Sequence, residues 1–157
     1  MDKTYSYLNN EIFNDKLNLA LDEPGFNQKI VGRYNLKGEN ESSFIFNISH
    51  DAENTQSEID IKAVLHDEAK LKILGTIILN KKSVGAKTNF NVKVLILGSK
   101  AKAIVLPKLM IDCKDIESAK HAVVIKRISN DDLYFMASRG ISMEKAKKLV
   151  EEGFLSN

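Results

Sequence analysis

The stretch SEIDIKAVLHDEAKLKILGTIIL, residues 57–79, contains the pattern that decides the fold of this chain. Apolar and polar side chains alternate with a period of two on both sides of a polar break at residues 66–70. Such alternation is typical of β-strands that bury one face, whereas an amphipathic helix repeats every three to four residues. The apolar positions are Ile59, Ile61, Ala63 and Leu65 before the break, and Leu71, Ile73, Gly75, Ile77 and Leu79 after it. The stretch therefore predicts two strands joined by a short turn.

The same alternation extends over roughly residues 30–126 and predicts a mainly β core. It recurs in SSFIFNISH (42–50) and in TNFNVKVLIL (88–97). Further breaks fall at residues 38–40, 50–56, 80–87 and 98–102. No break contains a tight-hairpin dipeptide such as Asn-Gly, and no exact internal repeat is visible. Strand starts spaced roughly 12–20 residues apart suit either a β-sandwich or a solenoid of short strands, and periodicity alone leaves both open.

Residues 1–22 follow a different pattern, which ends at the sequence DEPGF, residues 22–26. The apolar residues of this segment are Leu8, Ile12, Phe13, Leu17, Ala20 and Leu21. Their spacing is close to the period of a helix. We therefore expect an N-terminal helix or loosely attached arm at residues 1–28, a β core at residues 29–126 and a helical segment at residues 127–157.

Two short helices are predicted at the C-terminal end of the chain. Ser129 or Asn130 can cap the first helix, because their side-chain oxygens accept from free backbone N–H groups. Gly140 falls where a left-handed residue is wanted after that helix. Ser142 can cap the second helix, and Gly153 is expected to end it.

The composition is that of an ordinary folded chain, with 43% apolar and 28% charged residues among 157. A net charge of +2 does not indicate nucleic acid or an anionic membrane as a partner. The single cysteine, Cys113, excludes a disulfide within the chain and a four-thiolate metal site. The first residues show no secretory signal, and no window approaches the ~18 apolar residues of a membrane span. We therefore expect a cytoplasmic protein that binds neither nucleic acid nor a membrane.

Four stretches of the chain resemble one known family. They are HDAENTQS (50–57), IKAVLHDEAKLKILGTIIL (61–79), PKLMID (107–112) and KHAVVIKRISNDDLYFMASRGISMEKAKKLVEEGF (120–154). The last stretch is the most specific, because helix-capping residues, the pair Arg139-Gly140 and the pair Tyr134-Phe135 occur in it together. These stretches resemble the SufB/SufD family of iron–sulfur cluster assembly proteins, and they are more similar to its SufD branch.

The resemblance implies a right-handed parallel β-helix with short C-terminal helices packed beside it. It also implies a non-enzymatic scaffold that pairs edge to edge with a SufB-like chain or with a second copy of itself. The helices are expected to dock SufC, an ABC-type ATPase. The chain itself lacks the Gly-x-x-x-x-Gly-Lys-Ser/Thr phosphate loop of such an ATPase. The residues expected at the docking surface are Leu133, Tyr134, Phe135, Met136, Arg139, Gly140, Ile141 and Phe154. Their alternative role is to cover the apolar end of the sheet.

His121 is the candidate for binding iron, because it falls on a histidine of the family pattern and a neutral imidazole can ligate ferrous iron. The alternative is a strand histidine satisfied by the backbone. Cys113 falls on no family cysteine, and it is either a thiolate that accepts sulfur or a small buried side chain. The expected cargo is transient iron or an iron–sulfur cluster at a dimer interface. The alternative function is an interaction module that kept the fold, lost cluster chemistry and serves or regulates another partner.

Two His-Asp pairs, His50-Asp51 and His66-Asp67, could suggest hydrolytic or metal chemistry. Adjacent residues of a strand point to opposite faces, so neither pair forms a natural catalytic dyad, and we interpret both as solvated turns. A β-helix enzyme that cleaves polysaccharides would need clustered carboxylates. The strands supply only Glu58, Asp60 and Asp112, which the sequence does not bring together.

Overall fold

The computed structural model describes residues 3–9 and 14–156, which form nine strands followed by two helices. The strands are β1 (Lys3–Asn9), β2 (Asn14–Leu21), β3 (Asn27–Leu36), β4 (Glu41–His50), β5 (Gln56–Leu65), β6 (Lys70–Leu79), β7 (Lys87–Ile96), β8 (Lys102–Ile111) and β9 (Ser118–Arg127). The helices are α1 (Asn130–Ala137) and α2 (Met143–Ser156). The prediction of a mainly β chain that ends in two short helices is confirmed.

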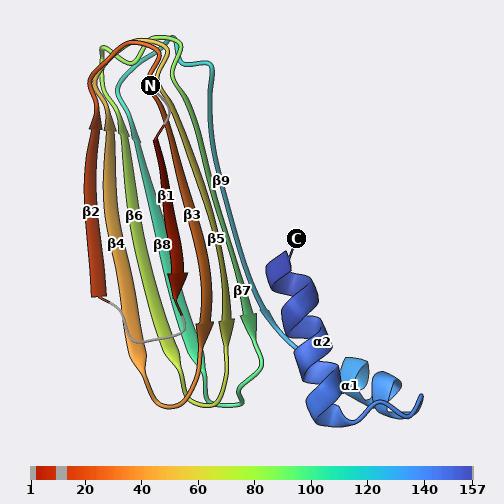
Figure 1. Cartoon of the computed structure of the whole chain (residues 1–157). Helices are drawn as coiled ribbons and strands as arrows, with labels where there is room; N and C mark the ends of the chain where they lie inside the picture. Colours follow the sequence, from red (N-terminus) through yellow and green to blue (C-terminus); the bar gives the residue numbers. More distant parts are fainter. Residues whose placement is uncertain (1–2, 10–13, 157) are drawn as a thin grey trace.

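The strands form two parallel sheets, one from the odd strands in the order β1-β3-β5-β7-β9 and one from the even strands in the order β2-β4-β6-β8. The chain winds from one sheet to the other and back, so that the odd strands point toward the helices and the even strands point away (Figure 1). Register partners in the odd sheet are 29 residues apart for Asn27 and Gln56, and 31 apart for Gln56 and Lys87. The fold is therefore a parallel β-solenoid, as the family resemblance predicted.

Inward-facing apolar residues from both sheets make one continuous core. The sets predicted from alternation are all buried, including Phe44 and Phe46 on β4 and Phe90 on β7. The Phe46 ring lies between the other two, with its centroid 5.3 Å from that of Phe44 on the same strand and 5.4 Å from that of Phe90 on the other sheet. Burial of each ring stabilises the fold by about 1.5–3 kcal/mol. The core also explains Gly75, because a Cβ at this position would collide with the ring of Phe46, its register partner.

A chain of buried polar side chains links neighbouring coils along the edge of the solenoid where β4 ends and β5 and β7 begin. His50 lies 2.9 Å from Thr55 Oγ1 through Nδ1 and 2.9 Å from Ser57 Oγ through Nε2. Ser57 Oγ lies 2.7 Å from Thr88 Oγ1 on the next coil. Burial lowers the pKa of His50 to about 4, so the ring is neutral near neutral pH. The interpretation of His50 as part of a solvated turn is therefore wrong, since its side chain is fully buried.

The N-terminal prediction is also wrong for the described residues, because residues 3–9 and 14–21 are strands and not a helix. In β2 the more buried side chains of Leu17, Leu19 and Leu21 alternate with the exposed Asn18 and Ala20, and β2 pairs in parallel with β4. Residues 1–2 and 10–13 of the expected helix or arm lie outside the described residues. The division into three segments at residues 28 and 126 stays a prediction.

The helix caps agree with most of the prediction. Ser129 Oγ accepts from the backbone N–H of Asp132 at 3.0 Å, and Ser142 Oγ accepts from that of Lys145 at 3.3 Å. Gly140 has the predicted left-handed conformation, with φ +82°. The prediction that Gly153 ends the second helix is wrong, because α2 continues to Ser156. The last turn is held against the sheet, and this tertiary contact outweighs the weak helix propensity of glycine.

Candidate partner-binding surfaces

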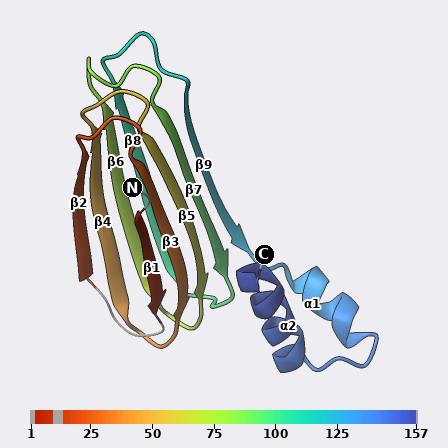
Figure 2. The same ribbon diagram turned by 45° about the horizontal axis from the view of Figure 1, so that its top comes forward.

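Helix α2 packs on the outward face of the odd sheet (Figure 2). An apolar patch on the sheet is made by Val64, Leu95 and Leu97. The residues that pack against it are Ile128, Val150, Phe154 and Leu155. This cluster is separate from the solenoid core, so the helix is attached to the outside of the coils.

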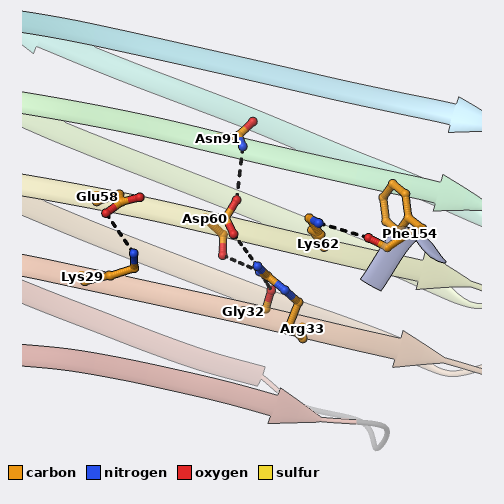
Figure 3. Close-up of polar contacts among 8 residues, drawn as sticks. All are labelled: Lys29, Gly32, Arg33, Glu58, Asp60, Lys62, Asn91 and Phe154. Carbon is orange, nitrogen blue, oxygen red and sulfur yellow. Dashed lines mark hydrogen bonds and ion pairs between the residues drawn. The ribbon is translucent and has the colours of Figure 1, made fainter. Parts of the chain in front are cut away.

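Polar contacts on both sides of this patch fix the position of α2. The Lys62 ammonium donates to the Phe154 carbonyl at 3.1 Å and lies 5.9 Å from the centre of its ring (Figure 3). Lys62 is only 4% exposed, and burial, with Arg33 nearby, lowers the pKa of its ammonium. A cation at this place also opposes the partial negative charge of the helix C-terminus.

Glu151 makes the second polar attachment of α2. Its carboxylate accepts from the Asn35 side-chain amide, and it lies 3.1 Å from His66 Nε2 without the alignment of a hydrogen bond. Burial lowers the pKa of His66 against the opposing pull of Glu151. His66 is therefore a residue of the helix–sheet joint, and the interpretation of it as part of a solvated turn is wrong.

Helix α1 buries one side chain and exposes the aromatic pair beside it. Leu133 is 3% exposed, whereas Tyr134 is 64% and Phe135 is 59% exposed. The Arg139 guanidinium lies 4.4 Å above the ring centre of Phe135, which is a cation–π contact on the surface. The glycine that follows, Gly140, lets the chain turn tightly into α2. An exposed aromatic pair next to an arginine is a composition that protein interfaces favour.

A groove of about 390 Å³ runs between the helices and the ends of β7 and β9. It is lined by Leu95, Lys126, Ile128, Asp132, Phe135, Met136 and Val150. Two of the predicted docking residues, Phe135 and Met136, therefore border a recess that is mostly apolar. Ile141 is half-buried at the loop between the helices.

The structure separates the eight predicted docking residues into two groups. Tyr134, Phe135, Arg139 and Gly140 are exposed, and Met136 and Ile141 are half-buried. Leu133 is buried, and Phe154 packs on the sheet. A period of three to four residues shows which side chains share a helix face, but it does not show which face meets the sheet. The contact between Lys62 and Phe154 was not predicted, because no pattern in either segment of the sequence points to the other.

The solenoid ends in an open coil made by β8 and β9. Within the described part of the chain, no strand pairs with the outer edge of either one. Their inward residues Val105, Leu109 and Val123 are only partly buried, and Ile111 and Ile125 are 49% and 44% exposed. Free strand edges above an apolar layer form a template for pairing with another chain.

His121 lies on this open end, exposed on β9 and in register with the buried Phe90. Cys113 is buried in the turn between β8 and β9. Residues 3–9 and 14–156 contain no group of three or more His, Cys, Asp or Glu side chains that could hold a metal ion.

The described residues form a parallel β-solenoid with an open terminal coil and a helix pair attached to its outside, and both features expose apolar side chains to solvent. Residues 1–154 match the sequence model of the SufBD core domain of the SUF system for FeS cluster assembly. The chain belongs to the SufBD family.

The chain is 30% identical over 106 residues to an iron–sulfur cluster assembly SufBD family protein of Staphylococcus saprophyticus. It is also 30% identical over 106 residues to the iron–sulfur cluster assembly protein SufB of Bacillus subtilis. Each match covers 68% of this chain and 23% of the relative, so the similar region is less than a quarter of those proteins. No helix among the described residues is long and apolar enough to cross a membrane.

Proposed function

We propose that this chain is a non-enzymatic scaffold subunit of iron–sulfur cluster assembly, similar to SufD. Its helix pair docks a SufC-like ABC ATPase, and its open coil pairs with a SufB-like chain or a second copy of itself. The compartment we propose is the cytoplasm. The match of residues 1–154 to the SufBD core domain supports the assignment to cluster assembly.

The observation that carries the docking proposal is that the exposed pair Tyr134 and Phe135 lies on a helix held in place by tertiary contacts. Helix α1 is held by the buried Leu133, and α2 is fastened to the odd sheet by Lys62 and Glu151. A partner bound at α1 is therefore connected to the solenoid through the packed contacts of α1 and α2. Motion of an ATPase could in this way be passed to the coils.

The pairing proposal rests on the open coil. A second chain at the edges of β8 and β9 would bury Val123, Ile111 and Ile125, and it would satisfy the free backbone groups of both edge strands. Such pairing would also enclose His121 and bring it close to side chains of the other chain. The cargo, iron or an iron–sulfur cluster, would be held transiently at that place.

The docking proposal is tested with purified SufC-like ATPase from the same cell and the immobilised chain. Tyr134→Ala/Phe135→Ala should weaken binding by at least about tenfold, since buried aromatic anchors dominate interface energies. Val84→Ala, which trims an apolar side chain that is 41% exposed in the turn between β6 and β7, is the matched control and should bind normally. Equal binding by both variants, or no binding of the wild type, contradicts the docking proposal.

A second candidate function is an interaction module that kept the fold and lost cluster chemistry. It is favoured by the buried position of Cys113 and by the lack of a three-ligand group among the described residues. Iron and sulfide analysis after anaerobic purification with its partners separates the two. Cluster that disappears in His121→Ala supports the scaffold, whereas ATPase binding without any iron supports the second candidate.

A further inference from the structure

Outward charges are paired on one part of the odd sheet. Between β3 and β5, cations of one strand meet anions of the other, as Figure 3 shows. Lys29 Nζ lies 3.1 Å from Glu58 Oε2, and the Arg33 guanidinium binds the Asp60 carboxylate. Asp60 also accepts from the Asn91 amide at 3.2 Å. These pairs neutralise outward charges between β3 and β5, whereas Lys93 on β7 and Lys120 and Lys126 on β9 are exposed and form no ion pair among the described residues.

The outward face of β6 and β8 on the even sheet combines lysines with aliphatic side chains and carries no carboxylate. Its positions are Lys70, Lys72, Leu74, Thr76 and Ile78 on β6, and Lys102, Ile104, Leu106, Lys108 and Met110 on β8. We call this set the lysine–aliphatic face. Among the described residues, Lys70 meets Glu41 at 3.7 Å, while neither Lys72 nor Lys108 has an ion-pair partner.

The aliphatic side chains that β8 contributes to this face are unusually exposed, whereas Leu74 and Ile78 on β6 are half-buried. Ile104 is 52%, Leu106 58% and Met110 45% accessible to solvent. They point away from the core, so they add nothing to the interior of the solenoid. The outward positions of β5 and β7 nearest the middle of each strand are polar by contrast, as at Asp60 and Asn91. Grouped exposed aliphatic residues mark a surface that another molecule covers.

The chain itself provides an example of how such a patch is covered. On the odd sheet, α2 places Phe154 and Val150 on the apolar patch of Val64 and Leu95, while its Glu151 carboxylate faces polar groups of the sheet. An amphipathic helix with carboxylates beside its apolar stripe would fit the lysine–aliphatic face in the same way. Ten residues of strand extend about 33 Å, which is the length of a helix of about 20 residues.

We propose that the lysine–aliphatic face binds an acidic amphipathic helix of a partner protein. The apolar stripe of the helix would lie on Leu74, Ile104 and Leu106, and its carboxylates would pair with Lys72 and Lys108. The same face of a second copy is a poor occupant, because lysines would oppose lysines. The face belongs to the even sheet, on the other side of the solenoid from α1 and α2 (Figures 1 and 2). The proposal therefore does not depend on ATPase docking at the helices.

The test uses the purified full chain and two labelled helical peptides of about 18 residues. Both peptides carry leucine at positions i, i+3, i+4 and i+7, and the flanking positions are glutamate in one and lysine in the other. Fluorescence anisotropy should show the glutamate peptide binding at least about tenfold more tightly, with the difference shrinking in high salt. The variant Lys72→Glu/Lys108→Glu should reverse the preference, and Lys72→Gln/Lys108→Gln should remove it. Lys81→Glu/Lys82→Glu, in an exposed turn, is the matched control and should behave as wild type.

Four results overturn the proposal. Equal affinity for the two peptides, or a preference that both lysine variants leave unchanged, would show that Lys72 and Lys108 do not select carboxylates. A third result is that the protein binds phosphatidylglycerol vesicles and neither peptide. If Lys72→Glu/Lys108→Glu abolishes that vesicle binding, the occupant of the face is a membrane surface. A change in the sedimentation of the protein alone in that variant, without peptide binding, identifies a contact between copies. Loss of ATPase binding in Tyr134→Ala/Phe135→Ala affects only the docking proposal.

Discussion

Lys62 and Phe154 lie 92 residues apart in sequence, yet the Lys62 ammonium donates to the Phe154 carbonyl at 3.1 Å. This contact joins the middle strand of the odd sheet to the last turn of the chain. Burial and neighbouring cations lower the pKa of the Lys62 ammonium, because moving a charge out of water costs free energy. A buried cation that contacts a helix end fixes the helix in one position.

Lys62→Met should therefore loosen α2 while leaving the solenoid folded. Methionine fills a similar volume but cannot donate to Phe154, and a lost hydrogen bond to a charged group costs about 1.5–3 kcal/mol. We expect faster amide hydrogen exchange in residues 143–156, by about tenfold or more, with unchanged exchange in β5 and β7. Lys93→Met is the control, because Lys93 occupies the same row of the sheet but is exposed. Equal exchange in both variants would show that the Lys62 contact does not hold α2.

Truncation of Leu133 and of its neighbours Tyr134 and Phe135 should change the free energy of unfolding by very different amounts. Leu133→Ala removes a buried side chain and should lower the free energy of unfolding by about 2–5 kcal/mol. Tyr134→Ala/Phe135→Ala removes exposed rings and should change stability by less than about 1 kcal/mol. Urea unfolding followed by circular dichroism measures both. A large stability loss in the double variant would mean that the aromatic pair supports the fold, and the surface assigned to partner binding would then be structural.

Acid should destabilise the protein through His50. The pKa of its buried ring is about 4 in the folded state, against about 6.5 for a histidine in the unfolded chain. A depressed folded pKa gives stability that is fully present above pH 6.5 and is lost as the pH falls toward 4, because the unfolded chain binds the proton first. The total loss is about 3 kcal/mol. His50→Gln should flatten the dependence of the urea midpoint on pH in this window, and an unchanged slope would contradict the role of His50.

Two glycines should differ in their tolerance of a methyl group. A Cβ at Gly98 would collide with backbone atoms of Asp67 and His66 in the neighbouring turn, which cannot move without disturbing the stack. Gly98→Ala should therefore lower the free energy of unfolding by about 3 kcal/mol or more. Gly153 has open space within α2, and Gly153→Ala should stabilise the protein by about 0.5–1 kcal/mol. Thermal unfolding of both variants gives the comparison, and a tolerated Gly98→Ala would mean that the turns are loosely packed.

The period of two identified the buried face of the middle strands, because side chains of a strand must alternate whatever the strand pairs with. It could not separate a sandwich from a solenoid, since that depends on which strands pair. Ile59 pairs with Ile30 and Phe90, each about 30 residues away, and no local pattern reveals such partners. The resemblance to a known family provided that information.

The N-terminal error had a visible signal. Leu17, Leu19 and Leu21 alternate as strand residues do, but Ala20 beside them also fits a helix face. On a short segment the two periods overlap, and pairing with β4 decides in favour of the strand. The docking residues were only partly predictable for a related reason. Leu133 and Phe154 are as apolar as Phe135, and only the position of the helices against the sheet determines which of them is exposed.

The stacking of coils has a consequence for dimensions. Register partners on neighbouring coils are 25 to 32 residues apart, and each coil advances the solenoid by one strand spacing, about 4.8 Å. Whole coils can be added or removed without changing which side chains face inward, whereas a change of one residue within a strand inverts them. The number of coils therefore determines the length of the solenoid. It sets, in steps of one strand, how far a molecule held at the helices stands from anything held at the first coils.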